Sequence, residues 1–177
     1  MAEILAFAGS NSSTSINYEL VKYTVSLLEN HNVLTLDMAR YPFPMYSADE
    51  EKQKGFSNSL IEFKDYFQQS QGLILSVNEH NGNPSGYFKN LLDWLSRLER
   101  KFLADTAVLL MSTSPGKRGG IGAMGVIQDL LPRFGAEIAS TFSLPSFGEV
   151  FSNGEIADQS LKEQHANALD IFLQKLN

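Results

Sequence analysis

The 177-residue sequence contains no cysteine, so a disulfide bond, a cysteine nucleophile and a thiolate metal site are all excluded. It also lacks any apolar run near the length of about eighteen residues that a membrane-spanning helix needs. The first residues carry no basic segment of the kind that opens a secretory signal peptide. We therefore expect a cytoplasmic protein that does not enter the membrane.

Positive charge is also scarce. The chain has 14 Lys and Arg against 20 Asp and Glu, which gives a formal net charge of -6. Because binding to a nucleic-acid backbone requires clustered basic side chains, we expect no nucleic-acid partner. Hydrophobic residues make up 43% and charged residues 19% of the chain, a composition typical of folded globular proteins rather than disordered ones.

Short apolar runs alternate with segments in which apolar residues recur about every 3.6 positions, as in a helix. Each run fits a strand buried on both faces of a sheet, and the runs span residues 3–8, 33–36, 72–77, 107–111 and 137–139. A last helix is expected at about 159–176, packed on the first. This alternation predicts an α/β fold in which a doubly wound, five-stranded parallel sheet carries helices on both faces. We expect residues 1–177 to form one domain.

Ligands of such sheets bind beyond the carboxyl ends of the strands, where the strand order reverses. The loop after the first strand, residues 9–17, consists almost entirely of small, hydroxyl-bearing or amide residues. Small side chains let backbone N–H groups approach a phosphate, and the following helix N-terminus adds partial positive charge. No Lys precedes Lys22, so the loop is not a Walker A loop, and a monophosphate held by neutral donors is favoured. The alternative is a Ser-rich turn in which Ser15 or Thr14 caps the helix.

The loop after the third strand, residues 76–86, is dense in polar groups. Glu79 and His80 together suggest a metal site or an acid–base pair. Neighbouring residues of an extended loop point in opposite directions, however, and His31 and His165 fall in peripheral helices or turns. We therefore expect no metal ion.

The loop after the fourth strand contains a formal G-x-G-x-x-G pattern at Gly120, Gly122 and Gly125. A dinucleotide fingerprint belongs in the first strand–helix unit and needs an acidic residue about twenty positions later, where this chain has Pro145. We expect instead that Gly122 and Gly125 let a helix lie close to the sheet. The glycines expected to keep the loop thin against a flat ligand are Gly116, Gly119 and Gly120.

Taken together, the three loops resemble those of the NADPH-dependent FMN reductase family, which includes quinone, azo-dye and chromate reductases. The first-loop motif is matched by Gly9, Ser10, Ser15 and Asn17, and the third by Ser114, Gly116, Gly119 and Gly120. The second motif is matched by Glu79, Asn81, Gly86, Lys89, Asn90, Asp93 and Trp94.

The chain departs from these motifs at several positions. Ser12 stands where the family usually has an arginine near the phosphate, so the choice between NADPH and NADH stays open. Asn78 and Ser85 replace prolines, and His80 replaces a tyrosine that flanks the flavin ring. A histidine there is able to change the reduction potential or the fit of the substrate.

The resemblance implies a flavodoxin-like sheet of order 2-1-3-4-5 with bound FMN. NADPH or NADH gives a hydride to the flavin, and a quinone, azo compound, free flavin or metal ion then takes the electrons. No side chain need act as acid or base, so no catalytic residue is assigned. Trp94 is expected to serve packing or a subunit interface, and a homodimer or homotetramer is expected. The residues expected to hold FMN are Ser10, Ser12, Thr14, Ser15, Ile16, Asn17, Glu79, His80, Asn81, Gly82, Ser114, Gly116 and Gly119.

Two other functions remain open from the sequence. One is a flavodoxin-type electron carrier that binds FMN but is not reduced directly by NAD(P)H. Such carriers usually bracket the ring with aromatic side chains, and the candidates near the loops are Tyr41, Phe43, Tyr46, Tyr87 and His80. The other is a flavin-binding or regulatory domain that has lost reductase activity.

Overall fold

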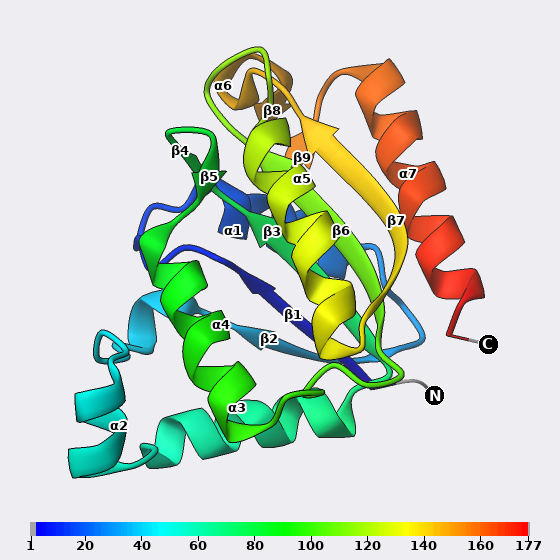
Figure 1. Ribbon diagram of the computed structural model, residues 1–177. Coiled ribbons are helices and arrows are strands. Elements are labelled where there is room, and N and C mark those ends of the chain that lie inside the picture. The colour runs from blue at the N-terminus through cyan, green and yellow to red at the C-terminus, as the bar shows by residue number, and fades with distance from the viewer. Residues whose placement is uncertain (1–2, 177) are drawn as a thin grey trace.

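Five parallel strands form the central sheet of the protein. The computed structural model describes residues 3–176, and Figure 1 shows the strands side by side through the middle of the molecule. In spatial order they are β2 (Asn32–Leu36), β1 (Glu3–Ala8), β3 (Gly72–Val77), β6 (Ala107–Thr113) and β7 (Glu137–Leu144). Counted among these five strands alone, the order is 2-1-3-4-5, so the predicted doubly wound sheet is confirmed.

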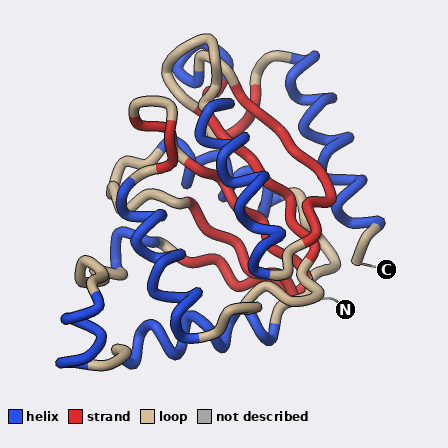
Figure 2. The backbone as a smooth tube through the Cα atoms, in the orientation of Figure 1, coloured by secondary structure: helices blue, strands red, loops and turns tan. Residues whose placement is uncertain are grey.

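Helices cover both faces of the sheet, as the sequence predicts, and Figure 2 shows the strands lying between them. One face carries α1 (Ile16–Ser26) and α7 (Gln159–Gln174), and the other carries α3 (Asn58–Gln69), α4 (Gly86–Leu98) and α5 (Ile121–Leu130). Successive side chains of a strand point to opposite faces. Leu5 and Phe7 of β1 therefore enter the core under α3 to α5, whereas Ile4 enters the core under α1 and α7.

Shorter elements join these layers. They are the 3-10 turns η1 (Met38–Arg40) and η2 (Leu131–Phe134), the helices α2 (Ala48–Lys54) and α6 (Phe147–Val150), the hairpin of β4 (Glu79–His80) and β5 (Asn83–Pro84), and the hairpin of β8 (Phe151–Ser152) and β9 (Glu155–Ile156). Among residues 3–176, no helix is both long enough and apolar enough to span a bilayer.

The two edge strands correct the prediction that every strand is buried on both faces. The central strands β1, β3 and β6 are buried almost throughout, but β2 and β7 are buried at only a few positions. An edge strand has a neighbour on one side only, and the helices do not cover it completely. The ladder of β7 also continues to Leu144, well past residue 139, because polar residues such as Thr141 still pair with β6.

The Pro-rich segment 41–46 is a loop, and α4 holds it in place. The Asn90 side chain accepts a 2.7 Å hydrogen bond from the Tyr46 N–H and donates a 2.9 Å bond to the Pro44 carbonyl. The Trp94 indole N–H donates to the same carbonyl at 2.8 Å, and Trp94 is almost completely buried. Asn90 and Trp94, two residues of the second motif, thus hold this loop against α4.

The last helix, α7, packs on α1 as predicted, and His165 lies in this helix, as expected. Its ring is fully buried between Tyr23 and Phe142, and its Nε2 lies 2.9 Å from the Thr24 hydroxyl of α1. Burial lowers the pKa of His165 to about 4. Although α7 is peripheral, this histidine is therefore a neutral core residue.

Candidate functional site

Three loops meet in a cleft of about 210 Å³ at the carboxyl ends of β1, β3 and β6. Figure 1 places these strand ends on the same side of the molecule as the β4–β5 hairpin and the β6–α5 loop. The lining residues are Ser10, Ser12, Thr14, Ser15, Ile16, Asn17, Asn78, Glu79, His80, Thr113, Ser114 and Pro115. The lining includes every residue of the first loop that the sequence predicted, together with Glu79, His80 and Ser114. It includes no Lys or Arg.

The first loop leaves backbone donors free at the start of α1. Ser15 is the N-cap residue, and its hydroxyl accepts a 3.2 Å hydrogen bond from the Tyr18 N–H. Of the two capping candidates, Ser15 is therefore confirmed. Within the described chain, the N–H groups of Ile16 and Asn17 have no acceptor. Because they lie at the positive end of the helix dipole, they are suited to bind an anion.

The hydroxyls of the first loop fix its shape. The Ser10 hydroxyl accepts a 3.2 Å hydrogen bond from the Ser12 N–H. The Ser12 hydroxyl in turn accepts from the Thr14 N–H at 3.3 Å and lies 3.3 Å from the Thr14 hydroxyl. The loop is thus held by its own side chains, and Ser12 and Thr14 remain exposed to a ligand.

Asn17 joins α1 to the ends of two strands. Its side-chain oxygen accepts hydrogen bonds from the Ser76 hydroxyl at 2.7 Å and from the Thr113 N–H at 3.1 Å. Its side-chain amide donates to the Thr113 carbonyl at 3.2 Å, and the residue is 2% exposed. The side chain of Asn17 therefore positions the loop, whereas its backbone N–H is free for a ligand.

Glu79 reaches from the β4–β5 hairpin to the start of α5. Its Oε2 accepts a 2.9 Å hydrogen bond from the Ala123 N–H, and the N-cap residue of α5, Gly120, provides no side-chain cap. Glu79 thus caps α5 from a distant part of the sequence. A Cβ on Gly122 would lie 2.6 Å from this Oε2. Gly122 therefore lets α5 lie close to the β4–β5 hairpin, and not close to the sheet as the sequence predicts.

Other glycines of the predicted pattern behave differently. A Cβ on Gly125 would meet nothing within 4 Å, so the prediction that Gly125 permits close packing is wrong. A Cβ on Gly116 would lie 3.9 Å from the Ser114 hydroxyl, which is an ordinary contact. Gly119 is constrained because its φ is +59° and a Cβ there would collide with the Ser143 hydroxyl. Neither Gly116 nor Gly119 lines the cleft.

The β4–β5 hairpin presents His80 at the cleft. His80 is exposed, and its Nε2 lies 3.2 Å from the side-chain amide nitrogen of Asn78. The Asn78 side-chain oxygen is buried without a partner among residues 3–176. Asn81 and Gly82 have φ values of 53° and 76° and form the tip of the hairpin, so they lie outside the cleft lining.

Sequence reasoning missed three lining residues, namely Asn78, Thr113 and Pro115. Each adjoins a residue or motif that was singled out. Thr113 is the last residue of β6, and a polar side chain at the carboxyl end of a buried strand is a signal that could have identified it.

Two larger hollows lie away from this cleft. One, of about 420 Å³, is lined by Gln71, Asp105 and Glu137 among others, and it lies at the amino ends of the strands. The other, of about 460 Å³, lies between β7 and α7. Ligands of open α/β sheets bind at the carboxyl ends of the strands, so position favours the smaller cleft over the larger volumes.

The strand order and the cleft beside the reversal between β1 and β3 define a flavodoxin-like protein. The family model for NADPH-dependent FMN reductase matches residues 2–147, and the chain belongs to this family. It is therefore an enzyme whose cofactor is FMN and whose reductant is NAD(P)H.

Individual relatives agree with this assignment. The chain is similar to a quinone reductase of Escherichia coli (strain K12), at 29% identity over 136 residues that cover 73% of this chain and 71% of the relative. It is also similar to a probable NADPH:quinone oxidoreductase 2 of Oryza sativa subsp. japonica, at 26% identity over 91% of this chain and 82% of the relative.

Solved structures have the same fold. The flavoenzyme FerB, an NAD(P)H:(acceptor) oxidoreductase from Paracoccus denitrificans, superposes with a TM-score of 0.73 at 21% identity over 99% of both chains. The apo form of the NADH:FMN oxidoreductase EMOB gives a TM-score of 0.75 at 20% identity, over 100% of this chain and 91% of that one.

Proposed function

We propose that this protein is an FMN-dependent NAD(P)H oxidoreductase that passes electrons to a quinone, azo compound, flavin or metal-ion acceptor. The observation that carries the proposal is the pair of free N–H groups of Ile16 and Asn17 in the cleft. Quinones are the first acceptors to test, because relatives that resemble this chain are named quinone reductase and NADPH:quinone oxidoreductase.

The cleft suits a monophosphate better than a longer phosphate chain. It offers the free backbone donors of Ile16 and Asn17 and several hydroxyls of the first loop, and its lining has no Lys or Arg. A monoester phosphate at a helix N-terminus needs no more than this, whereas a triphosphate generally requires a Lys and a metal ion. The phosphate of FMN is thus assigned to Ser10, Ser12, Thr14, Ser15, Ile16 and Asn17.

The remaining residues are assigned to the flavin ring. Glu79, His80, Asn81, Gly82, Ser114, Gly116 and Gly119 come from the two loops that face the first one. Of these, Glu79, His80 and Ser114 line the cleft directly. The other four lie on the supporting turns. The buried, unpartnered oxygen of Asn78 is a further acceptor available to a ring N–H.

Bound FMN would supply the redox chemistry of a two-electron carrier between the nucleotide and the acceptor. The protein's own contribution is to orient the reactants and to leave one face of the ring open. Glu79 is the one carboxylate in the cleft lining, and its Oε2 is engaged by the Ala123 N–H. We therefore assign no side chain as a catalytic acid or base.

A flavodoxin-type carrier is the alternative function, and the positions of the aromatic side chains favour the reductase instead. Tyr41 packs on Phe63, and Phe43 packs on Tyr87, at the edge of the core that α3 and α4 cover. Tyr46 packs on Trp94. None of these four tyrosine and phenylalanine candidates is in the cleft lining, so no such ring is in place to bracket the flavin.

The experiment that tests the proposal is anaerobic stopped flow on FMN-loaded protein. NADPH and NADH are added separately, and the flavin absorption band is followed. Rapid bleaching with either nucleotide supports the reductase and identifies its donor. A bound flavin that stays oxidised with both nucleotides would favour the carrier, and failure to retain FMN would refute the assignment of the cleft.

We also propose that residues 1–177 form a single FMN-binding domain, that the protein works in the cytoplasm, and that it assembles as a homodimer or homotetramer. Light scattering coupled to size exclusion measures the assembly directly. A monomer at micromolar concentration would contradict that part of the proposal and leave the chemistry unaffected.

A further inference from the structure

The cleft has no cationic side chain for the second nucleotide. Its lining is neutral apart from Glu79 and the histidine His80. A pyridine nucleotide brings a pyrophosphate, and NADPH adds a 2′-phosphate, so the reductant carries at least two negative charges. The neutral donors of the first loop are already assigned to the phosphate of FMN. Positive charges that bind the phosphates of the nucleotide must therefore come from residues outside the cleft lining.

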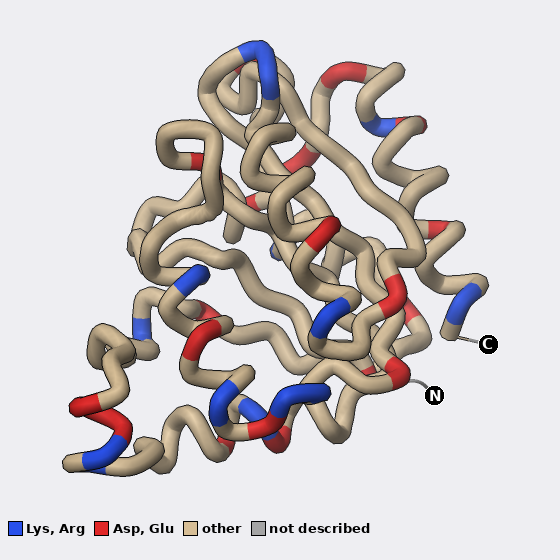
Figure 3. Tube along the Cα trace, viewed as in Figure 1, with Lys and Arg blue, Asp and Glu red and all other residues tan. Residues whose placement is uncertain are grey.

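The β6–α5 loop has two adjacent cations at its apex. Gly119 N–H donates a 3.2 Å hydrogen bond to the Gly116 carbonyl, which closes a tight turn with Lys117 and Arg118 as its central residues. Both side chains are exposed. Figure 3 shows them as the blue segment at the top of this loop.

The base of this turn is firmly anchored. The Gly119 carbonyl accepts hydrogen bonds from the Ser112 hydroxyl at 2.7 Å and from the Ser143 hydroxyl at 3.1 Å. The Ser146 N–H donates to the Gly116 carbonyl at 2.9 Å. A rigid turn loses little backbone entropy when its side chains bind a ligand. Because Ser114 and Pro115 line the cleft, the apex lies at its rim.

Neither cation is committed to an ion pair. Among residues 3–176, Lys117 and Arg118 face no carboxylate within 4.0 Å. Other cations follow the carboxyl ends of the strands or lie on nearby helices, but they are paired: Lys22 with Glu19 at 2.8 Å, Arg40 with Asp37 at 3.7 Å and Lys162 with Glu155 at 2.7 Å. At the start of α5 the Ala123 N–H is already engaged by the Glu79 carboxylate, so Lys117 and Arg118 supply the positive charge of this loop.

We propose that Lys117 and Arg118 bind the phosphates of the pyridine nucleotide and set the preference between NADPH and NADH. This inference rests on the proposed function. Arg118 is able to form a bidentate pair with a phosphate, and Lys117 adds a point charge. On a protein of net charge -6, two free cations at the rim also attract an anionic substrate to the site. They supply the positive charge that is missing at position 12, where this chain has Ser12.

The test compares FMN-loaded wild type with the double variant Lys117→Ala/Arg118→Ala. Calorimetry measures the Kd of NADP+ and NAD+, which bind without turnover. We expect the double variant to bind NADP+ about fivefold to tenfold more weakly, because each exposed charge pair contributes modestly. If NAD+ weakens equally, the contact is to the pyrophosphate, and the claim that the two residues set the preference is refuted. If NAD+ is unchanged, the contact is to the 2′-phosphate. Unchanged affinity for both nucleotides would overturn the inference.

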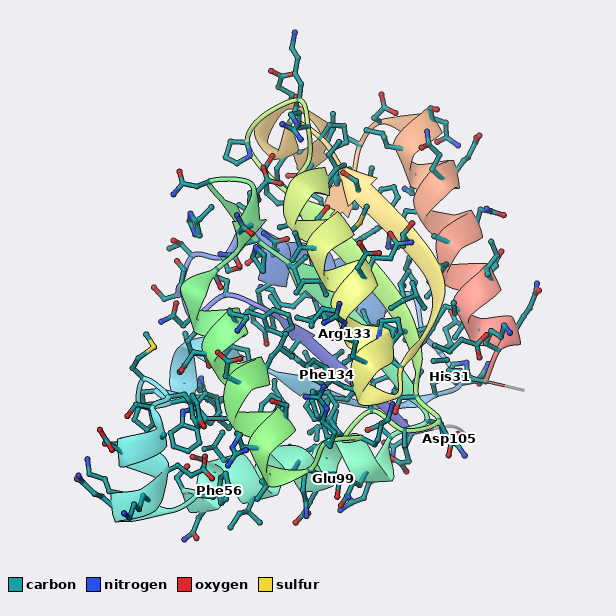
Figure 4. All side chains as sticks on the ribbon, in the orientation of Figure 1. His31, Phe56, Glu99, Asp105, Arg133 and Phe134 are labelled. Carbon is teal, nitrogen blue, oxygen red and sulfur yellow. The ribbon has the colours of Figure 1, made fainter. Side chains whose placement is uncertain are left out.

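A matched control removes the same charges elsewhere. Lys52 on α2 and Arg133 on η2 are exposed and lie outside the cleft lining. Figure 4 labels Arg133 at the end of α5 opposite to the β6–α5 loop. The variant Lys52→Ala/Arg133→Ala should keep wild-type affinity, and an equal loss in this variant would attribute the effect to net charge and contradict the site.

The same samples separate this inference from the proposed function. If the wild-type flavin is not reduced by either nucleotide, the proposed function fails. If it is reduced, and the Kd of NADP+ and the KM for NADPH are the same in wild type and Lys117→Ala/Arg118→Ala, the reductase stands and the nucleotide site is refuted.

Discussion

The loop after β1 and the loop after β6 both join a buried strand to a helix, but they use their polar groups in opposite ways. In the first loop, the N–H groups of Ile16 and Asn17 are left free. In the second, the Glu79 carboxylate accepts a hydrogen bond from the Ala123 N–H at the start of α5. The Gly119 carbonyl of this loop accepts hydrogen bonds from two serine hydroxyls. The first loop therefore offers free backbone donors at the start of a helix, whereas the second is anchored at the Gly119 carbonyl and has Glu79 at the start of its helix.

The largest expected effect concerns the helix behind the first loop. His165 supports α1 through Thr24, and burial lowers the pKa of His165 from 6.5 to about 4. The unfolded chain therefore takes up a proton at higher pH than the folded one. This contribution to stability is present above pH 6.5 and is lost as the pH falls towards 4, amounting to about 3 kcal/mol.

Urea titrations between pH 7 and pH 4 measure this loss, and hydrogen exchange locates it. We expect α1 to lose protection before α5. His165→Gln should remove this component of the pH dependence. An unchanged dependence in the variant would show that other groups cause the acid lability.

The second prediction tests whether the base of the β6–α5 loop is held rigidly at Gly119. Gly119→Ala places a Cβ against the Ser143 hydroxyl at a positive φ, and we expect a loss of about 2 kcal/mol in the free energy of unfolding. Gly116→Ala is the matched control, because the added Cβ makes only an ordinary 3.9 Å contact with the Ser114 hydroxyl. Chemical denaturation measures both, and equal stability of the two variants would contradict the difference in their roles.

The third prediction concerns the anion site. Ser10→Asp places a carboxylate in the first loop, where we expect it to repel the phosphate and weaken FMN binding by more than about 1.4 kcal/mol, or tenfold. Ser114→Asp introduces the same charge in the other loop and should cost much less. Fluorescence titration of FMN gives both dissociation constants. If Ser10→Asp binds FMN as wild type does, the first loop is not the phosphate site.

The smallest expected effects come from two glycines of α5. Gly122→Ala displaces the Glu79 carboxylate, and we expect a loss of about 1 kcal/mol of stability, because the cap on α5 is weakened. Gly125→Ala has open space around its Cβ and should gain about 0.5–1 kcal/mol from helix propensity. Opposite shifts in melting temperature are expected. Two shifts of the same sign would contradict the assigned role of Glu79.

The fold was largely predictable because its signals are local and periodic. The runs at 3–8 and 72–77 coincide with β1 and β3, since a strand buried on both faces is continuously apolar. The ends of β6 and β7 were less predictable, because Ser112 and Thr141 belong to the ladder through hydrogen bonds that leave no trace in the apolar pattern. The cap at Ser15 was also predictable, because it satisfies the N–H of Tyr18 only three residues away.

The sequence by itself determined the alternation of strands and helices, the small-residue loop after the first strand and the family motifs. Only the tertiary structure decided what the matched residues do. Asn17 bonds to residues 59 and 96 positions away, and Glu79 caps a helix that begins more than forty positions later. Asn90 and Trp94 hold a distant loop rather than a ligand. These roles depend on contacts between remote segments, which periodicity and propensity do not encode, because both report only on neighbours along the chain.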